Sequence, residues 1–119
     1  MNQRELIRLD ATIRYWTGGP VPAPTLVLLH GATLDHHAWD PQVKALNSRY
    51  RLVVPDLRGH GASTGPGPFT FEDAVDDIIA LIDHLDLERI GLIGAQPRRQ
   101  HRPGGHGRPR GVPEVGLSL

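Results

Sequence analysis

The sequence contains no cysteine, which excludes disulfide bonds and metal sites built on thiolates. Its 13 basic and 13 acidic side chains give a formal net charge of zero, so no overall field favours nucleic acid or a membrane surface. No apolar run approaches the roughly 20 residues that a membrane helix needs. The first ten residues lack the apolar core of a signal peptide. We therefore expect one small cytoplasmic domain with no membrane partner and no cofactor.

The balanced charge hides two segments of different composition. Residues 1–94 carry 8 basic and 12 acidic side chains, a net charge of −4. Residues 95–119 carry five arginines and the single acid Glu114, a net charge of +4, and are crowded with glycine and proline. Because the second segment has no sustained apolar period, it cannot bury enough surface to offset its chain entropy. We predict a partial domain at 1–94 and a disordered tail at 95–119.

Strand patterns occur at five places in the first segment. Alternating apolar and polar residues predict a hairpin of two half-buried strands turning at Asp10. Three continuous apolar runs predict strands buried on both faces. In chain order, the predicted strands are 5–9, 11–16, 25–30, 50–54 and 89–94.

Helical spacing of apolar residues predicts a short helix near 40–47 and a longer one at about 71–86. Thr70 is the predicted N-cap of the longer helix. We expect its acids, among them Asp76 and Asp77, to form a solvated face supported by the helix dipole. Its predicted buried stripe is Phe71, Ala74, Val75, Ile78, Ile82 and Leu85. A hairpin followed by strand–helix–strand–helix–strand indicates an α/β fold with a mostly parallel sheet.

The stretch Leu26–Ala32 is the predicted centre of this fold. It is a continuous apolar run that ends at His30 and Gly31. A glycine directly after a buried strand allows close approach to the backbone. Open α/β sheets bind their ligands at the carboxyl ends of such strands, so we expect a site here.

Four segments together resemble the N-terminal half of the α/β-hydrolase fold: LVLLHG at 26–31, the downstream Trp39, VVPDLRGHGAS at 53–63 and RIGLIG at 89–94. The resemblance covers roughly residues 5–94. DLRGHGxS is its most specific motif, and its spacing from the HG pair and from the last strand fits the family.

The resemblance implies a site and a chemistry. In the family, the loop after the HG strand supplies one backbone N–H of the oxyanion hole, which here falls on Ala32. The residues implied to shape the site are His30, Gly31, Asp56, Gly59, His60 and Gly61. The full-length parent is then expected to hydrolyse a small ester or lactone, without a metal. The elbow that a shifted reading frame permits, described below, favours a serine nucleophile over the aspartate used by some relatives.

The sequence departs from the family where the nucleophile elbow G-x-S-x-G should follow Gly94. The serine position holds Gln96, which is not a nucleophile, and Arg98 occupies the place of the second glycine. Pro97 lacks the N–H that the residue after the nucleophile should donate. The family's acid and histidine come later than any residue present. We therefore expect no intact catalytic residue and no activity from this chain.

An excess of proline, arginine and glycine is what a GC-rich gene gives when it is read out of frame. Read from each second base, the codons of residues 95–108 permit L-S-L-G-G-N-I-A-Q-E-V-M-A-A, which with Gly94 before it gives an elbow followed by an amphipathic helix. We expect a frameshifted or truncated reading of a longer hydrolase. The alternatives are a short non-catalytic remnant or interaction protein with a new tail, and weak nucleic-acid binding through the arginines.

Other polar residues are expected to be structural. The ring of His30 should bond nearby backbone, Asp56 should be a hydrogen-bonding loop residue, and Ser63 should bond locally within its turn. The adjacent histidines His36 and His37 are expected to be solvated and not metal-bound. Finally, a strand at 89–94 that ends the sheet would leave an apolar edge, which predicts self-association.

Overall fold

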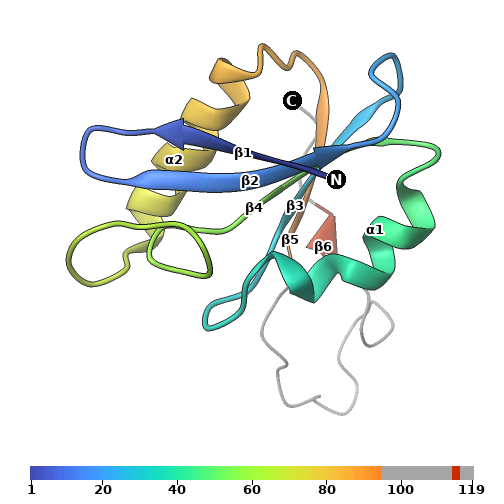
Figure 1. Ribbon diagram of the computed structural model, residues 1–119. Helices are drawn as coiled ribbons and strands as arrows, with labels where there is room; N and C mark the ends of the chain where they lie inside the picture. The colour runs from blue at the N-terminus through green and yellow to red at the C-terminus, as the bar shows by residue number, and fades with distance from the viewer. Residues whose placement is uncertain (95–113, 116–119) are drawn as a thin grey trace, which may run out of the picture.

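The computed structural model describes residues 1–94 and 114–115 (Figure 1). Both strands of the predicted hairpin, both helices and the three buried strands are present, with ends shifted by a few residues at most. The elements are β1 (Asn2–Ile7), β2 (Thr12–Gly18), β3 (Thr25–Leu29), the 3-10 helix η1 (His36–Trp39), α1 (Asp40–Leu46), β4 (Arg51–Pro55), α2 (Phe71–His84), β5 (Ile90–Gly94) and β6 (Glu114–Val115).

The strands form one mixed sheet in the order β1-β2-β4-β3-β5-β6. The hairpin β1–β2 is antiparallel and joins β4 in antiparallel fashion. The central strand β3 runs parallel to both β4 and β5. The α/β class and the central place of this strand are therefore confirmed.

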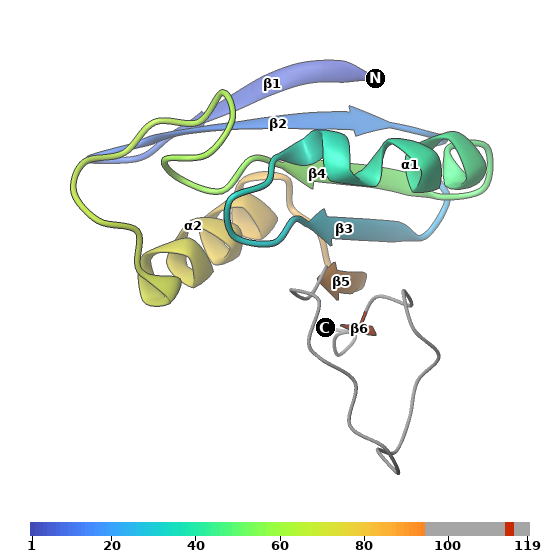
Figure 2. The ribbon, with the colours of Figure 1, turned by 90° about the horizontal axis from the view of Figure 1, so that it is seen from below.

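The helices α1 and α2 cover opposite faces of the sheet, as Figures 1 and 2 show. Successive residues of a strand point to opposite faces, and β3 and β4 divide their side chains accordingly. Val27 and Val53 pack with Leu81 of α2. Leu28 and Leu52 pack with Trp39 and α1 on the other face. Burial on both faces explains why these strands read as continuous apolar runs.

The buried face of α2 agrees with the predicted stripe in part. Ala74 and Ile78 are buried and Ile82 and Leu85 pack against the core, but Phe71 and Val75 do not. Thr70 caps the helix as expected, since its side chain accepts a hydrogen bond from the backbone N–H of Asp73. The buried residues of the helix are Ala74, Asp77, Ile78 and Leu81. Phe71 and Val75 are instead 76% and 39% exposed. The expectation that Asp77 is solvated is wrong, because the helix is rotated to bring this carboxylate inward.

The strand β5 has one neighbour along most of its length. It pairs with β3 throughout, while the two-residue strand β6 pairs only with Ile93 and Gly94. The predicted disorder of the tail lies outside the described residues, apart from Glu114–Val115, which form β6. Neither described α-helix combines the length and apolarity needed to cross a membrane.

Candidate active site

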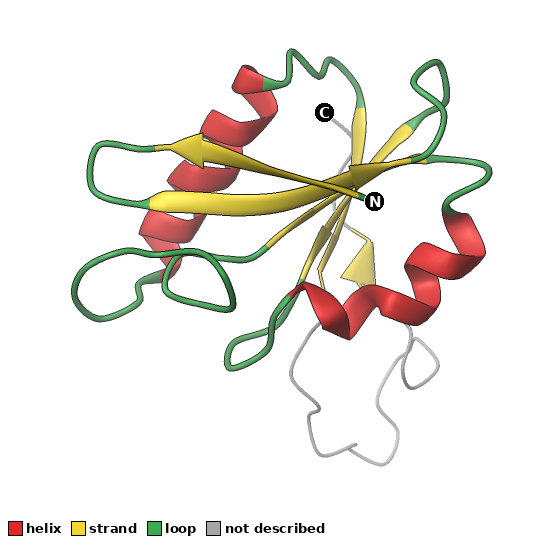
Figure 3. Cartoon of the chain, in the orientation of Figure 1, coloured by secondary structure: helices red, strands yellow, loops and turns green. Residues whose placement is uncertain are grey.

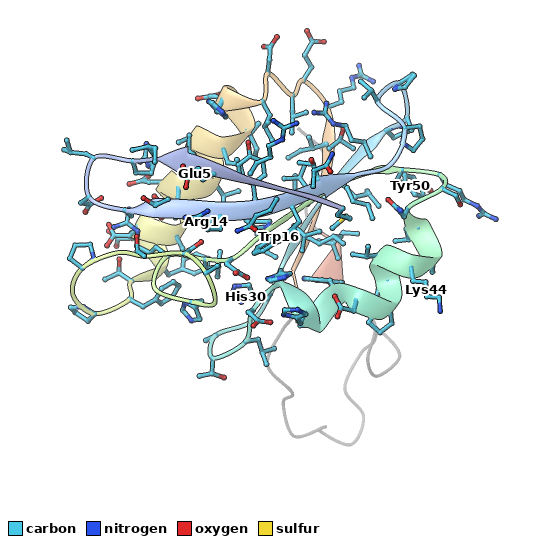
Figure 4. All side chains as sticks on the ribbon, viewed as in Figure 1. Glu5, Arg14, Trp16, His30, Lys44 and Tyr50 are labelled. Atoms are coloured by element: carbon cyan, nitrogen blue, oxygen red, sulfur yellow. The ribbon has the colours of Figure 1, made fainter. Side chains whose placement is uncertain are left out.

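Two loops meet at the carboxyl edge of the parallel strands. The first follows β3 and includes residues 30–35, and the second follows β4 and includes residues 56–63. Figure 3 shows the long loop that joins β4 to α2, and Figure 4 labels His30 at the end of β3. Because β3 and β4 are parallel neighbours, both loops leave the sheet at the same edge.

His30 ties these two loops together. Its side chain is buried, and its Nε2 accepts a hydrogen bond of 2.9 Å from the backbone N–H of Leu57. Its Nδ1 therefore carries the proton and donates to the carbonyl oxygen of Gly31 at 2.8 Å. Burial lowers the pKa of His30, against the opposing effect of the Gly31 carbonyl. The prediction of a structural histidine bonded to nearby backbone is confirmed.

Asp56 organises the loop after β4 from its centre. Its carboxylate is fully buried, and Oδ1 accepts hydrogen bonds from the backbone N–H and the ring Nδ1 of His36, at 2.7 and 2.9 Å. Oδ2 accepts one from the backbone N–H of Ala62 at 2.8 Å. These bonds confirm the prediction of a hydrogen-bonding loop residue.

Two glycines let the second loop wrap around this carboxylate. Gly59 and Gly61 both have positive φ, at 72° and 51°. A β-carbon at Gly61 would collide with the carboxylate of Asp56, whereas one at Gly59 would meet no atom within 4 Å. Gly61 is therefore required both by backbone conformation and by close approach.

His60 and Ser63 complete the same loop. His60 hydrogen-bonds the carbonyl of Arg58 through Nδ1 at 3.0 Å, and its ring centroid lies 5.2 Å from that of His30. Ser63 donates to the carbonyl of Asp56 at 2.7 Å, as expected of a local bonder. It also accepts a 2.8 Å bond from the backbone N–H of Arg14, which fastens the loop to β2.

His36 corrects a prediction. Its side chain is only 16% exposed, and its ring stacks on Trp16 with centroids 3.5 Å apart. The expectation of a solvated residue is therefore wrong for His36, although His37 is 67% exposed as predicted. The reason is long-range, since Trp16 and Asp56 each lie 20 positions away in the chain.

Arg58 and Asp77 form a buried ion pair that the sequence analysis missed. The guanidinium donates through Nε and Nη2 to the two carboxylate oxygens of Asp77, at 2.7 and 2.8 Å. It also reaches Asp10 in the hairpin turn at 3.2 and 3.3 Å. These partners raise the pKa of Arg58 further above its usual range. The sequence did contain an indication that Asp77 is buried, because Asp77 lies at helical spacing between the apolar residues Ala74 and Leu81.

Ala32 lies in an exposed turn directly after His30 and Gly31. The N–H of Leu34 donates to the carbonyl of Gly31 at 3.1 Å, which closes the turn. Thr33 has a φ of 68°, a left-handed conformation that is unusual for a β-branched residue. Within the described part of the chain, no acceptor is found for the backbone N–H of Ala32. This N–H is free to bind a ligand.

The six site-shaping residues predicted from sequence thus lie together at the carboxyl ends of β3 and β4. Gln96, at the predicted nucleophile position, lies outside the described residues. The strand β5, which precedes it in the chain, nevertheless ends beside β3. Leu29 pairs with Gly94, so β3 and β5 end side by side.

A family model described as alpha/beta hydrolase fold matches residues 24–95. The chain belongs to the α/β-hydrolase family. This α/β-hydrolase is 36% identical over 87 residues to 3-oxoadipate enol-lactonase 1 of Acinetobacter baylyi, which covers 73% of the chain and 33% of the lactonase. Other relatives are named as carbamate hydrolases and epoxide hydrolases. The chain spans about a third of the length of the curated relatives it matches.

Solved structures give the same result. A hydrolase from Pseudomonas aeruginosa has a TM-score of 0.73 at 35% identity, covering 78% of this α/β-hydrolase chain and 36% of that one. The enol-lactonase from Burkholderia xenovorans has a TM-score of 0.66 at 36% identity, with coverage of 71% and 34%.

Proposed function

We propose that this chain is the N-terminal portion of an α/β-hydrolase that cleaves a small ester or lactone. The observation that carries the proposal is the exposed, unpaired N–H of Ala32 at the carboxyl end of β3. Lactonases are among the relatives by name, and a lactone is a cyclic ester. Both substrates develop a negative carbonyl oxygen when a nucleophile attacks.

The geometry of the edge fits this chemistry. Because Leu29 pairs with Gly94, β3 and β5 end side by side, and β3 leads directly into the turn that holds Ala32. In the full-length parent, a serine that follows β5 would attack the substrate carbonyl, its proton passing to a histidine later in the chain, and the N–H of Ala32 would donate to the oxyanion formed as the C=O π bond opens. Fixed donors of this kind contribute about 3–4 kcal/mol each to catalysis. The ties from His30 and Asp56 hold both loops in place, so that the donor needs no reorganisation.

We further propose that the present 119-residue sequence does not catalyse this reaction. The elbow position holds Gln96, and Pro97 has no N–H to serve as the second oxyanion donor. The test is hydrolysis of p-nitrophenyl acetate and of a simple lactone, with the heat-denatured chain as the background. We expect no turnover above background. Turnover by the folded chain that persists in Gln96→Ala would overturn this part of the proposal.

The same proposal includes a shifted reading frame after Gly94. Sequencing the gene through this point and downstream tests it, and we expect a one-base shift to open a long frame that begins with a serine elbow. Protein made from that frame should hydrolyse the esters and lose this activity when the elbow serine becomes alanine. If no one-base shift opens such a frame, this part of the proposal is wrong.

A further inference from the structure

We propose that Asp35, His36 and His37 form a binding site for a divalent cation of the Zn²⁺ type. The three residues follow one another just before and within η1. Each can offer one ligand atom, and these three atoms lie within 4.8 Å of one another. Asp35 and His37 have no role in the proposed hydrolysis, and His36 contributes to it only by anchoring Asp56.

Asp35 and His37 already have the separation of two ligands on one ion. Oδ1 of Asp35 and Nδ1 of His37 are 3.3 Å apart. Two ligand atoms at typical Zn²⁺ distances in tetrahedral geometry are about 3.3 Å apart. The same carboxylate oxygen accepts the backbone N–H of His37 at 2.9 Å. Since a carboxylate has further lone pairs, this hydrogen bond and metal binding are compatible.

His36 is prepared as a metal ligand by its surroundings. Its Nδ1 is held by the buried carboxylate of Asp56 at 2.9 Å, which leaves Nε2 as the nitrogen for a cation. Metal-binding histidines commonly donate their other ring N–H to a carboxylate, which fixes the ring and makes the ligand more basic. The stack on Trp16 further limits rotation of the ring.

The ligand set selects the class of ion. Two imidazoles and one carboxylate suit Zn²⁺ and similar transition metals, whereas Mg²⁺ and Ca²⁺ prefer sites made of oxygen atoms. Three protein ligands leave one tetrahedral position for water. Because a metal ion competes with protons for the nitrogen atoms of its histidine ligands, the site should lose affinity as the pH falls.

Competition between the metal-free 119-residue protein and a chromophoric chelator for Zn²⁺ measures the affinity directly. We expect one site that binds Zn²⁺ and does not bind Mg²⁺. Because His37 is largely exposed, His37→Gln should keep the fold. It should weaken Zn²⁺ binding by at least about tenfold, because loss of a hydrogen-bond partner of a metal ligand already costs that much and His37 would itself be a ligand. Asp35→Ser, which preserves a capping hydroxyl, should weaken it similarly.

Matched controls separate this site from other histidines. His84→Gln removes an exposed histidine at the end of α2 and should leave the affinity unchanged. A double variant, His101→Gln with His106→Gln, should also bind Zn²⁺ normally. The proposal is wrong if His37→Gln and Asp35→Ser bind as tightly as the unmodified protein, or if the tail double variant abolishes binding.

Discussion

At the scale of single residues, the long-range polar contacts of this protein concentrate around two carboxylates. Asp56 joins the loop after β4 to η1, and Asp77 receives hydrogen bonds from Arg58 and Arg8. Both side chains are 2% exposed or less. A buried charge is tolerated only when its partners are in place, so these contacts define how the loops lie over the sheet.

Removing one member of the Arg58–Asp77 pair should be costly. We expect Asp77→Ala to lower the free energy of unfolding by about 3–5 kcal/mol, the range for breaking a buried ion pair. Chemical denaturation measures this change. Glu5→Gln is the control, because the Glu5–Arg14 pair is about 40–45% exposed and such pairs contribute about 1 kcal/mol or less. Equal effects of the two changes would contradict the assignment.

His30 should make stability depend on pH. Its pKa is lowered from 6.5 in the folded state, so the unfolded chain takes up the proton first as the pH falls. The contribution of neutral His30 to the free energy of unfolding is fully present above pH 6.5 and is lost as the pH falls toward the folded pKa. The free energy of unfolding then changes by at most about 1.4 kcal/mol per pH unit. When the free energy of unfolding is measured by denaturation between pH 8 and 5, it should fall less steeply with falling pH for His30→Gln than for the unmodified protein. An unchanged slope would contradict this role.

At the scale of elements, α2 shows how one buried acid changes the face of a helix. Apolar spacing alone favoured a stripe through Phe71 and Val75, both of which are exposed. The helix instead buries Asp77 against Arg58, with Ala74 and Leu81 on either side. The existence and approximate ends of the helix follow from local signals, but its rotation depends on a partner 19 positions away.

Substitution of single side chains of α2 by alanine should show which face of the helix is buried. Leu81→Ala removes a side chain that is 1% exposed and should cost about 2–5 kcal/mol of unfolding free energy. Ile79→Ala, at a position that is 52% exposed, should cost less than about 1 kcal/mol. Thermal or chemical unfolding of both variants measures the contrast. Similar losses would show that the helix buries a different face.

At the scale of the whole molecule, the sheet has unequal edges. The strand β1 forms one edge, whereas β5 is covered by β6 only at Ile93 and Gly94. Gly91 and Leu92, on the described part of the chain, pair with β3 alone. An apolar strand with open backbone groups is a template for pairing with another copy.

We expect concentration-dependent self-association through β5, measurable by sedimentation velocity. Leu92→Lys should reduce it, because a charged residue at a sheet edge opposes pairing. Ile79→Lys places the same charge on the exposed face of α2 and serves as the control. If Ile79→Lys prevents association and Leu92→Lys does not, the molecules associate through α2 instead. A monomer at all concentrations would contradict both.

The sequence by itself determined the order of the strands and helices along the chain, the central strand Thr25–Leu29 and the family. These follow from local periodicity and short motifs, which depend on neighbouring residues only. Tertiary structure alone decided that His36 stacks on Trp16 and binds Asp56, and that Asp77 pairs with Arg58. Their partners are about 20 positions away, and no local pattern specifies which of several distant charges or rings a buried side chain meets.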